Sequence, residues 1–389
     1  MNNPTINSVC RQGNIARQVR HKGKLVLIVI ASSLILAPAA QAFEFKTSGQ
    51  VSRMVVAPDD AVGDEIQHQD IGFSGSRFRF TGSETMDNGM TVGFRYEIQA
   101  RRGAAGGDGA ELTDGGDNQE NRLQDVYFKG GFGSIALGRG DGAGNGATEV
   151  DMSGTVLASP STLDSNWGGY KITPDLDGTA DDDSIAWNTV YKMFDANSRQ
   201  NRVRYDSPSF NGFSFAVSAN QGNANELAVR YKGTLFGHKF GAAYYTGSTA
   251  DSKDDTDDVG GNCDTTPTCV PVDGADISGG SASLLLNNGL NFTVAISESD
   301  ITGGTRDATF FKVGYKKGKH AFAVDQADGE NDAAVTEGDS TGFTYAYFPH
   351  KGVELFATVR TLDSTGVVDS TGGGAQSVDL TAIGTRLKF

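Results

Sequence analysis

Beyond residue 37 the sequence lacks any apolar run long enough for a membrane-spanning helix, which needs about 20 residues. Only 38% of the 389 residues are hydrophobic, which is a low share for a dense soluble core. Basic residues are also scarce, and the formal net charge is −15. Nucleic acid is therefore not an expected partner, because its binding depends on Lys and Arg residues that neutralise phosphates.

Cysteine and histidine are few. Cys263 and Cys269 lie in a polar segment with C-x5-C spacing. We expect a small loop disulfide there, because the export signal described below would place the chain in an oxidising compartment. A metal site would need more Cys or His nearby, so none is expected. A hydrolase would need a histidine in register with a nucleophile, and the scattered histidines argue against an enzyme. These histidines are His68, His238, His320 and His350.

What the sequence does have, at its N-terminus, is the pattern of a cleaved export signal over residues 1–42. Five Lys and Arg residues precede the apolar run Leu25–Ala37, and Ala40-Gln41-Ala42 offers a small-x-small cleavage site. An anchored N-terminal helix is the alternative. Cleavage would leave residues 43–389, and because the signal holds no Asp or Glu, the formal net charge would become −20.

Apolar and polar residues alternate over stretches of roughly ten residues along the rest of the chain, which is the periodicity of β-strands. In Met90–Ala100, Val92 and Phe94 share one face, while Arg95 and Glu97 share the other. Such parity suits a strand with one row of side chains in lipid and the other in a water-filled lumen. It would equally suit a soluble sandwich with one face on a core.

The connections between these stretches separate the two cases. Short turns such as Met86–Gly89 and Asn287–Gly289 alternate with long Gly/Asp-rich segments, as in outer-membrane barrels. We therefore predict an all-β fold, a transmembrane antiparallel β-barrel of sixteen strands that leaves no unpaired edge in lipid. A secreted β-sandwich that binds carbohydrate is the alternative. The predicted strands begin near 43, 71, 90, 121, 134, 199, 212, 226, 238, 277, 290, 308, 319, 340, 353 and 377.

Three stretches, Gly75–Ala100, Asn121–Gly142 and Asn201–Gly222, resemble the Gram-negative general porin family. The terminal Phe389 matches the family's aromatic last residue, which the barrel-assembly machinery reads. The resemblance implies a homotrimer in the lipid and lipopolysaccharide of the bacterial outer membrane. It also implies an inward-folded third outer loop, here 141–198, that narrows the pore. The implied function is passive diffusion of small hydrophilic solutes and ions.

A diffusion pore needs a water-filled constriction with charges of both signs. Arginine suits its wall because the guanidinium stays charged and its donors have a planar geometry. Inward parity selects Arg77, Arg79, Arg95, Arg202 and Arg204 for the wall, and the loop offers Asp141, Glu149 and Asp151. The alternative is that these arginines only pair with neighbouring carboxylates such as Glu97. The acidic loops favour cations, whereas the arginines of the wall favour anions locally. With a formal net charge of −20 after cleavage, we expect a weak preference for cations.

Two further patterns bear on ligands. The acidic runs Asp175–Asp183 and Asp251–Asp258 could hold weakly bound Ca2+, although solvated loop charge is the simpler interpretation, and no other cofactor is expected. Sugar channels line their path with aromatic side chains. A channel specific for a sugar or phosphate is therefore the second hypothesis, with Trp167, Tyr170, Trp187 and Tyr191 of the long loop as its candidate lining.

Overall fold

The computed structural model describes residues 43–59, 66–101, 118–173, 185–250, 252–254, 270–272, 274–301, 303–368 and 374–389. The chain divides into two compact units, Met1–Ala42 and Phe43–Phe389, and all described residues belong to the second. The predicted export signal and the predicted disulfide between Cys263 and Cys269 both lie outside the described residues.

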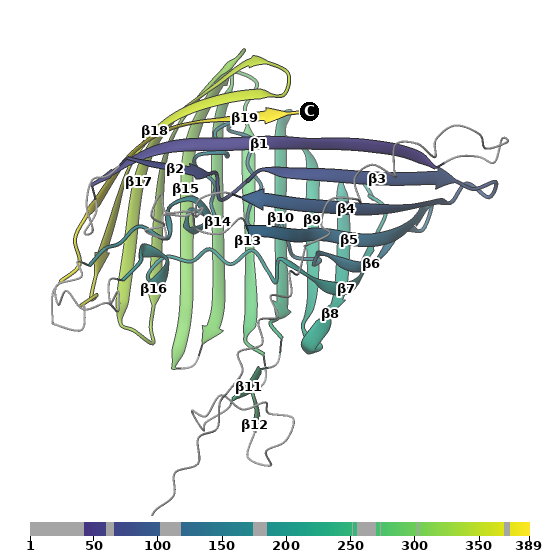
Figure 1. Cartoon of the computed structure of the whole chain (residues 1–389), viewed down its shortest axis with the longest axis horizontal. Coiled ribbons are helices and arrows are strands. Elements are labelled where there is room, and N and C mark those ends of the chain that lie inside the picture. The colour runs from purple at the N-terminus through teal and green to yellow at the C-terminus, as the bar shows by residue number, and fades with distance from the viewer. Residues whose placement is uncertain are drawn as a thin grey trace, which may run out of the picture. The chain divides into compact units, whose positions relative to one another are not determined.

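One antiparallel sheet closes on itself to form a barrel (Figure 1). It contains seventeen of the described strands, of which sixteen follow one another around the ring, as predicted. The first and last strands pair directly, from Gln50↔Lys388 to Asp59↔Asp379, so each end of the strand sequence has a partner. The ring consists of β1 (Glu44–Asp59), β3 (Arg77–Thr85), β4 (Thr91–Arg101), β5 (Asn118–Gly130), β6 (Gly133–Asp141), β7 (Arg199–Asp206), β8 (Phe213–Asn220), β9 (Asn225–Leu235), β10 (His238–Ser248), β13 (Asp276–Leu285), β14 (Leu290–Ile301), β15 (Gly304–Lys317), β16 (His320–Asn331), β17 (Thr336–His350), β18 (Val353–Thr365) and β19 (Val378–Lys388).

The wall strand next to β1 is broken into two pieces. β3 pairs with the first half of β1, and the short β2 (Gln67–Asp70) pairs with its second half. Asp70 stabilises the break, because its carboxylate accepts hydrogen bonds from the Ser76 amide and hydroxyl at 3.2 and 3.1 Å and pairs with Arg53 at 3.0 Å. The predicted start near residue 71 therefore falls in the break, and β3 begins at Arg77.

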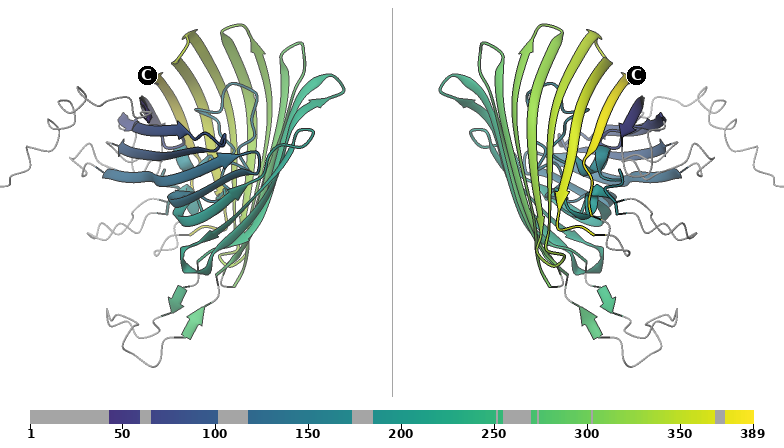
Figure 2. Two further views of the ribbon diagram at one scale, coloured as in Figure 1. Left: turned by 90° about the vertical axis from the view of Figure 1, so that its right-hand side faces the viewer. Right: turned by 90° about the vertical axis from the view of Figure 1, so that its left-hand side faces the viewer.

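Side chains along the wall alternate as the sequence predicts. On β14, Phe292, Val294 and Ile296 are 36%, 46% and 56% exposed, whereas Thr293 and Ala295 between them are buried. The exposed row is apolar and the covered row is small or polar, which reverses the order of a soluble protein. An outer surface of this kind suits lipid. Figure 2 shows the consecutive strands side by side around the wall from two sides.

Short turns join many of the strands where the sequence predicts them. Gly89, Gly289 and Gly352 have φ values of +80°, +97° and +83°, a left-handed conformation that glycine adopts without steric cost. The first turn is closed by the hydrogen bond from the Met86 amide to the Met90 carbonyl, at 2.8 Å. A separate two-stranded hairpin, β11 (Ser252–Asp254) with β12 (Val270–Val272), lies in the connection between β10 and β13.

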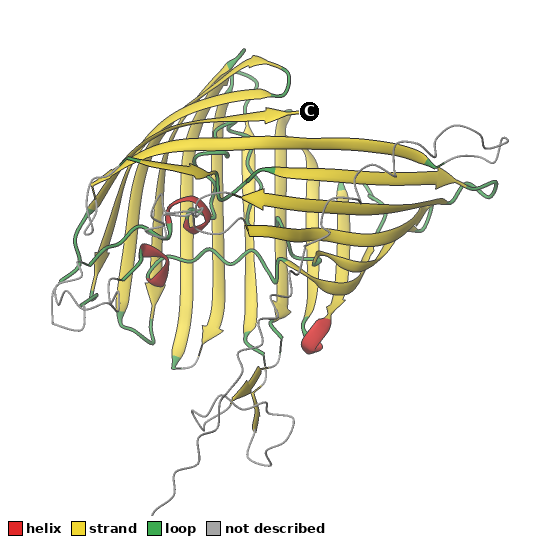
Figure 3. Ribbon diagram, viewed as in Figure 1, coloured by secondary structure: helices red, strands yellow, loops and turns green. Residues whose placement is uncertain are grey.

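The connection between β6 and β7 comprises residues 142–198, and its described parts, 142–173 and 185–198, pack against the covered face of the wall. The amides of Val150, Met152 and Phe194 donate to serine hydroxyls of β13 and β14 at 2.8 to 3.0 Å. It contains the single-turn helices α1 (Asp164–Trp167) and η1 (Trp187–Thr189), drawn red in Figure 3 together with η2 (Gln221–Asn223). Within the described ranges, every helix is too short or too polar to cross a membrane.

A hydrophobic cluster joins this connection to the wall. Phe310, Phe356 and Leu380 of the wall pack into the same cluster as the connection's aromatic residues. The indole and phenol groups are satisfied internally: Trp187 donates to the Asp363 carbonyl at 3.2 Å, and Tyr191 donates to the Ser161 carbonyl at 2.6 Å. The four candidates for a sugar track are fully buried here, and therefore do not line a water-filled path: Trp167, Tyr170, Trp187 and Tyr191.

Candidate functional site

Two cavities lie between the connection and the wall formed by β3 to β9. One, of about 490 Å³, reaches the inner side of the connection, and we call it the connection cavity. The other, of about 890 Å³, reaches Gly89 and Gly130 near the short turns, and we call it the turn-end cavity. The two cavities adjoin, because Asp141 and Asn145 line both. They form the candidate site.

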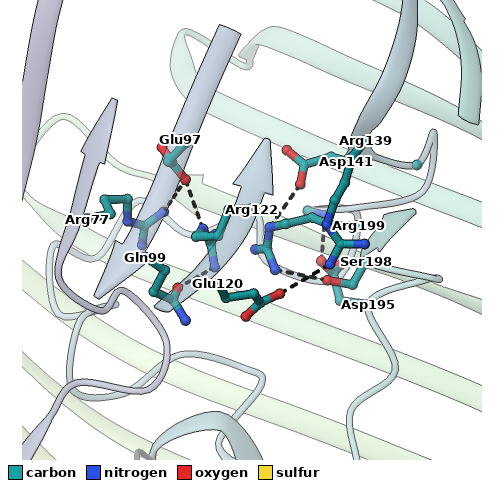
Figure 4. A network of polar contacts seen from close by, with 12 residues as sticks. Arg77, Glu97, Gln99, Glu120, Arg122, Arg139, Asp141, Asp195, Ser198 and Arg199 are labelled. Carbon is teal, nitrogen blue, oxygen red and sulfur yellow. Dashed lines mark hydrogen bonds and ion pairs between the residues drawn. The ribbon is translucent and has the colours of Figure 1, made fainter. Parts of the chain in front are cut away.

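Glu97, which is 1% exposed, contacts three arginines at the connection cavity, of which Figure 4 shows Arg77 and Arg122. Its carboxylate lies 2.7 Å from Arg79, 2.8 Å from Arg122 and 3.5 Å from Arg77. Arg122 also donates to the Gln99 side-chain oxygen at 2.7 Å. One buried carboxylate thus fixes three guanidinium groups on the inner wall, in geometries that charge-assisted hydrogen bonds favour.

Asp125 has the same role on the neighbouring strand, β5. Its carboxylate accepts from Arg95 at 2.9 Å and from Arg202 at 2.7 Å. Glycine at 140 is needed for this arrangement, because a Cβ there would lie 2.3 Å from the Arg202 guanidinium. Arg204 pairs with Asp206 at 2.7 Å and donates to the Gly142 carbonyl at 2.6 Å.

The five arginines predicted for the wall all stand on its inner face, but they divide between the two cavities. Arg77 and Arg79 line the connection cavity, whereas Arg95, Arg202 and Arg204 line the turn-end cavity. Each of them also pairs with a carboxylate. The two interpretations of these arginines, as pore lining and as partners of nearby acids, are therefore compatible in this structure.

The three predicted loop acids take different places. Asp141 lines both cavities and lies 3.3 Å from Arg199, and Glu149 lines the connection cavity. Asp151 lines neither of the two: it is paired at 2.7 Å with Lys312 of β15, whose side chain is 0% exposed. Its role is that of an anchor between the connection and the wall, because its oxygens are already occupied by the buried ammonium and the Ser153 amide.

Asp195 joins Glu149 at the connection cavity. Its carboxylate accepts from the Gly146 amide at 2.6 Å and the Thr148 hydroxyl at 2.8 Å, and Thr162 donates to Glu149 at 3.3 Å. Burial, and then the charge of Asp195, raise the pKa of Glu149 to about 8, and burial also raises the pKa of Asp195. Both residues lie in the connection, outside the membrane-spanning strands.

Sequence reasoning missed several charged residues of the site. The pairing of β4 with β5 passes from Glu97↔Leu123 to Ile98↔Asn121, so a bulge turns Arg122 inward against strict alternation. Arg199 begins β7 and faces Asp141. Arg230 follows the ordinary alternation of β9 and could have been found from it. Its guanidinium donates to the carbonyls of Ala143 and Asn145, at 2.7 and 3.0 Å.

The remaining candidates lie apart from the cavities. Phe389 is 63% exposed, its backbone pairs with Gly49 at 2.9 and 3.1 Å, and its ring lies 5.7 Å from that of Phe78. Its role in barrel assembly stays a prediction. Among the described residues, no group of three or more His, Cys, Asp or Glu is arranged to hold a metal ion. The acidic run Asp175–Asp183 lies outside the described residues, as does most of Asp251–Asp258.

A closed barrel with an apolar exterior and a charged internal passage defines a transmembrane β-barrel channel. The chain belongs to the Gram-negative porin family, whose model matches residues 26–366. No curated protein matches it by sequence. It is therefore a channel of the bacterial outer membrane through which small solutes pass by passive diffusion.

Solved structures share the fold at low identity. The chain is similar to the anion-selective porin from Comamonas acidovorans (17% identity, TM-score 0.58, covering 89% of this chain and 100% of that one). It is also similar to the outer membrane channel DcaP of Acinetobacter baumannii (9% identity, TM-score 0.58, 91% and 99%). A third is OmpT of Vibrio cholerae in its trimer form (16% identity, TM-score 0.53, 90% and 100%).

Proposed function

We propose that small hydrophilic solutes and ions cross the barrel through the two adjoining cavities, between the arginine wall and the β6–β7 connection. The observation that carries this proposal is the charge of the lining. Arginines of β3 to β7 stand on one side, Glu149 and Asp195 of the connection stand on the other, and Asp141 ends β6 at the edge of the arginine wall. Opposed charges of this kind set a transverse field in which polar solutes align.

The connection supplies the narrowing element of this proposal. Its hydrogen bonds to the serines of β13 and β14, and its hydrophobic cluster, hold it against the covered side of the wall. The basic wall consists of Arg77, Arg79, Arg95, Arg202 and Arg204. Glu149 and Asp195 form the acidic side, and Asp141 lies where the wall passes into the connection. We infer a channel without catalytic activity, since the family and the fold are those of channels.

We propose that three copies assemble in the membrane. The OmpT structure to which this chain is similar is described as a trimer form, and family membership supports the same arrangement. Lipid and lipopolysaccharide would surround the apolar exterior, and the barrel-assembly machinery would insert the chain.

Recording current across a planar bilayer tests the proposal. We expect the purified chain to insert in groups of three equal conductance steps, with a conductance that rises in proportion to the concentration of simple salts. Electrical silence after insertion would contradict the proposal. A conductance that saturates, or that one sugar or phosphate blocks, would favour a substrate-specific channel instead.

A further inference from the structure

Buried carboxylates at the inner wall are outnumbered by the arginines that contact them. Glu97 forms ion pairs with three guanidinium groups and Asp125 with two, so two negative charges stand against five positive ones. Both acids are almost fully buried, at 1% and 4% exposure. The excess positive charge therefore lies on the side of the arginines that faces the passage.

The turn-end cavity has an excess of positive charge. Among the described residues, Asp141 and Asp206 are the only acids in its lining. Counting Asp125 behind the wall and Glu44, which pairs with Lys46 at 2.7 Å, raises the acids to four. Arg230 donates to the backbone carbonyls of Ala143 and Asn145, and the nearby carboxylates of Asp206, Asp195 and Glu226 offset its charge only in part. Six cations line the cavity: Lys46, Arg95, Lys129, Arg202, Arg204 and Arg230.

The connection cavity does not offset this excess. Its lining has five basic and five acidic side chains, so its formal charges cancel. The raised pKa of Glu149 removes one negative charge at neutral pH, which leaves the cavity slightly positive. A solute that passes through both cavities thus meets a neutral or slightly positive region and then a more positive one.

Many of the carboxylates that make the whole chain acidic lie outside the passage. Exposed carboxylates form a cross-strand row on the outer face of β16, β17 and β18, where Asp328 is paired with Asp339 and Asp339 with Asp363. Salt screens exposed charges beyond about 10 Å, whereas a cleft with low-dielectric walls concentrates the field of its own lining. Ion preference is therefore set by the lining of the passage and not by the formal net charge of −15.

We propose that this channel is anion-selective, with the turn-end cavity concentrating small inorganic and organic anions such as chloride, phosphate and carboxylates. This inference rests on the proposed function, because it takes the two cavities as the route of ions. It reverses the weak cation preference expected from the sequence, because the sequence does not reveal how many acids stand against the arginines of the passage.

The test is the reversal potential of the full mature chain in a bilayer of uncharged lipid under a KCl gradient. We expect the sign that chloride permeation gives, with chloride several-fold more permeant than potassium. Arg230→Gln and Lys129→Gln should each lower the chloride to potassium ratio. Lys317→Gln removes the same charge from the outward side of β15 and should leave the ratio unchanged.

The outcomes separate the two proposals. A channel that conducts but favours potassium would overturn anion selectivity and leave the proposed function intact. Equal shifts for Arg230→Gln, Lys129→Gln and Lys317→Gln would overturn the assignment to the turn-end cavity. An insertion without any conductance would overturn the proposed function itself.

Discussion

Glu149 makes the charge of the passage depend on pH. Its pKa is raised from 4.5 to about 8, so at neutral pH the side chain is mostly protonated, and it ionises as the pH rises through 8. We expect the potassium to chloride permeability ratio to rise between roughly pH 6 and pH 9, because ionisation adds a negative charge to the connection cavity. Reversal potentials recorded across this range measure the effect.

Glu149→Gln is the matched control, since it keeps the shape and removes the titration. An unchanged pH profile in Glu149→Gln would show that another group is responsible.

The raised pKa of Glu149 also affects the stability of the fold in a defined direction. Because the folded pKa lies above the ordinary value, the stabilising contribution of protonated Glu149 is fully present below about pH 4.5 and is lost as the pH rises through about 8.

Among the elements, β16 marks on its outer face where lipid contact ends. Phe322 and Val324 are 41% and 52% exposed and apolar. The next two residues on the same face, Gln326 and Asp328, are polar. We expect Val324→Arg to destabilise the folded barrel by about 2–4 kcal/mol, the cost of a cation near the bilayer midplane. Asp328→Arg on the same face should cost nothing, because it relieves repulsion with Asp339.

Denaturant unfolding in lipid vesicles, followed by tryptophan fluorescence, measures both changes. If the two variants lose equal stability, the boundary has been placed wrongly on this strand. The comparison is informative because both substitutions lie on one strand and one face, so they differ chiefly in depth.

The β6–β7 connection depends on buried ion pairs with the wall. Lys312 and Asp151 are 0% and 4% exposed in their side chains, and they join β15 to the connection. Lys312→Met leaves Asp151 buried without its partner, which costs about 3–5 kcal/mol in comparable cases. We expect this variant to show a noisier single-channel current and faster protease cleavage within 142–198.

Adding Asp151→Leu to Lys312→Met should restore a quiet current, because a buried pair can be replaced by apolar residues of similar volume at little cost. A double variant as disturbed as the single one would mean that the pair's charges, and not merely the absence of an unpaired acid, are needed to seat the connection.

For the molecule as a whole, the features that the sequence predicts well are local. Strand positions follow from alternation and from glycine turns such as Gly89 and Gly289, and most predicted starts fall close to the observed ones. The five predicted arginines stand on the inner face for the same reason. Each of these signals is contained in a few consecutive residues.

The features that it predicts poorly depend on distant partners. Asp151 is paired with Lys312, which is 161 residues away in the sequence, and no local sequence pattern predicts that ion pair. Arg122 faces inward because it is the extra residue of a bulge in β5, opposite Glu97 and Ile98 of the neighbouring strand. The aromatic side chains of the connection look like a ligand track in the sequence, but the wall of β14 to β19 buries them. These outcomes are fixed only once the ring has closed.

The hydrophobic cluster between the connection and β14 to β19 has a consequence for permeation. Side chains fill some of the cross-section that sixteen strands enclose, and the two cavities lie on the arginine side. Strand number alone therefore overestimates the size of molecule that this porin admits. The molecular-weight cut-off will be set by the width of these cavities, and a bulky solute will be excluded even though the barrel around them is wide enough.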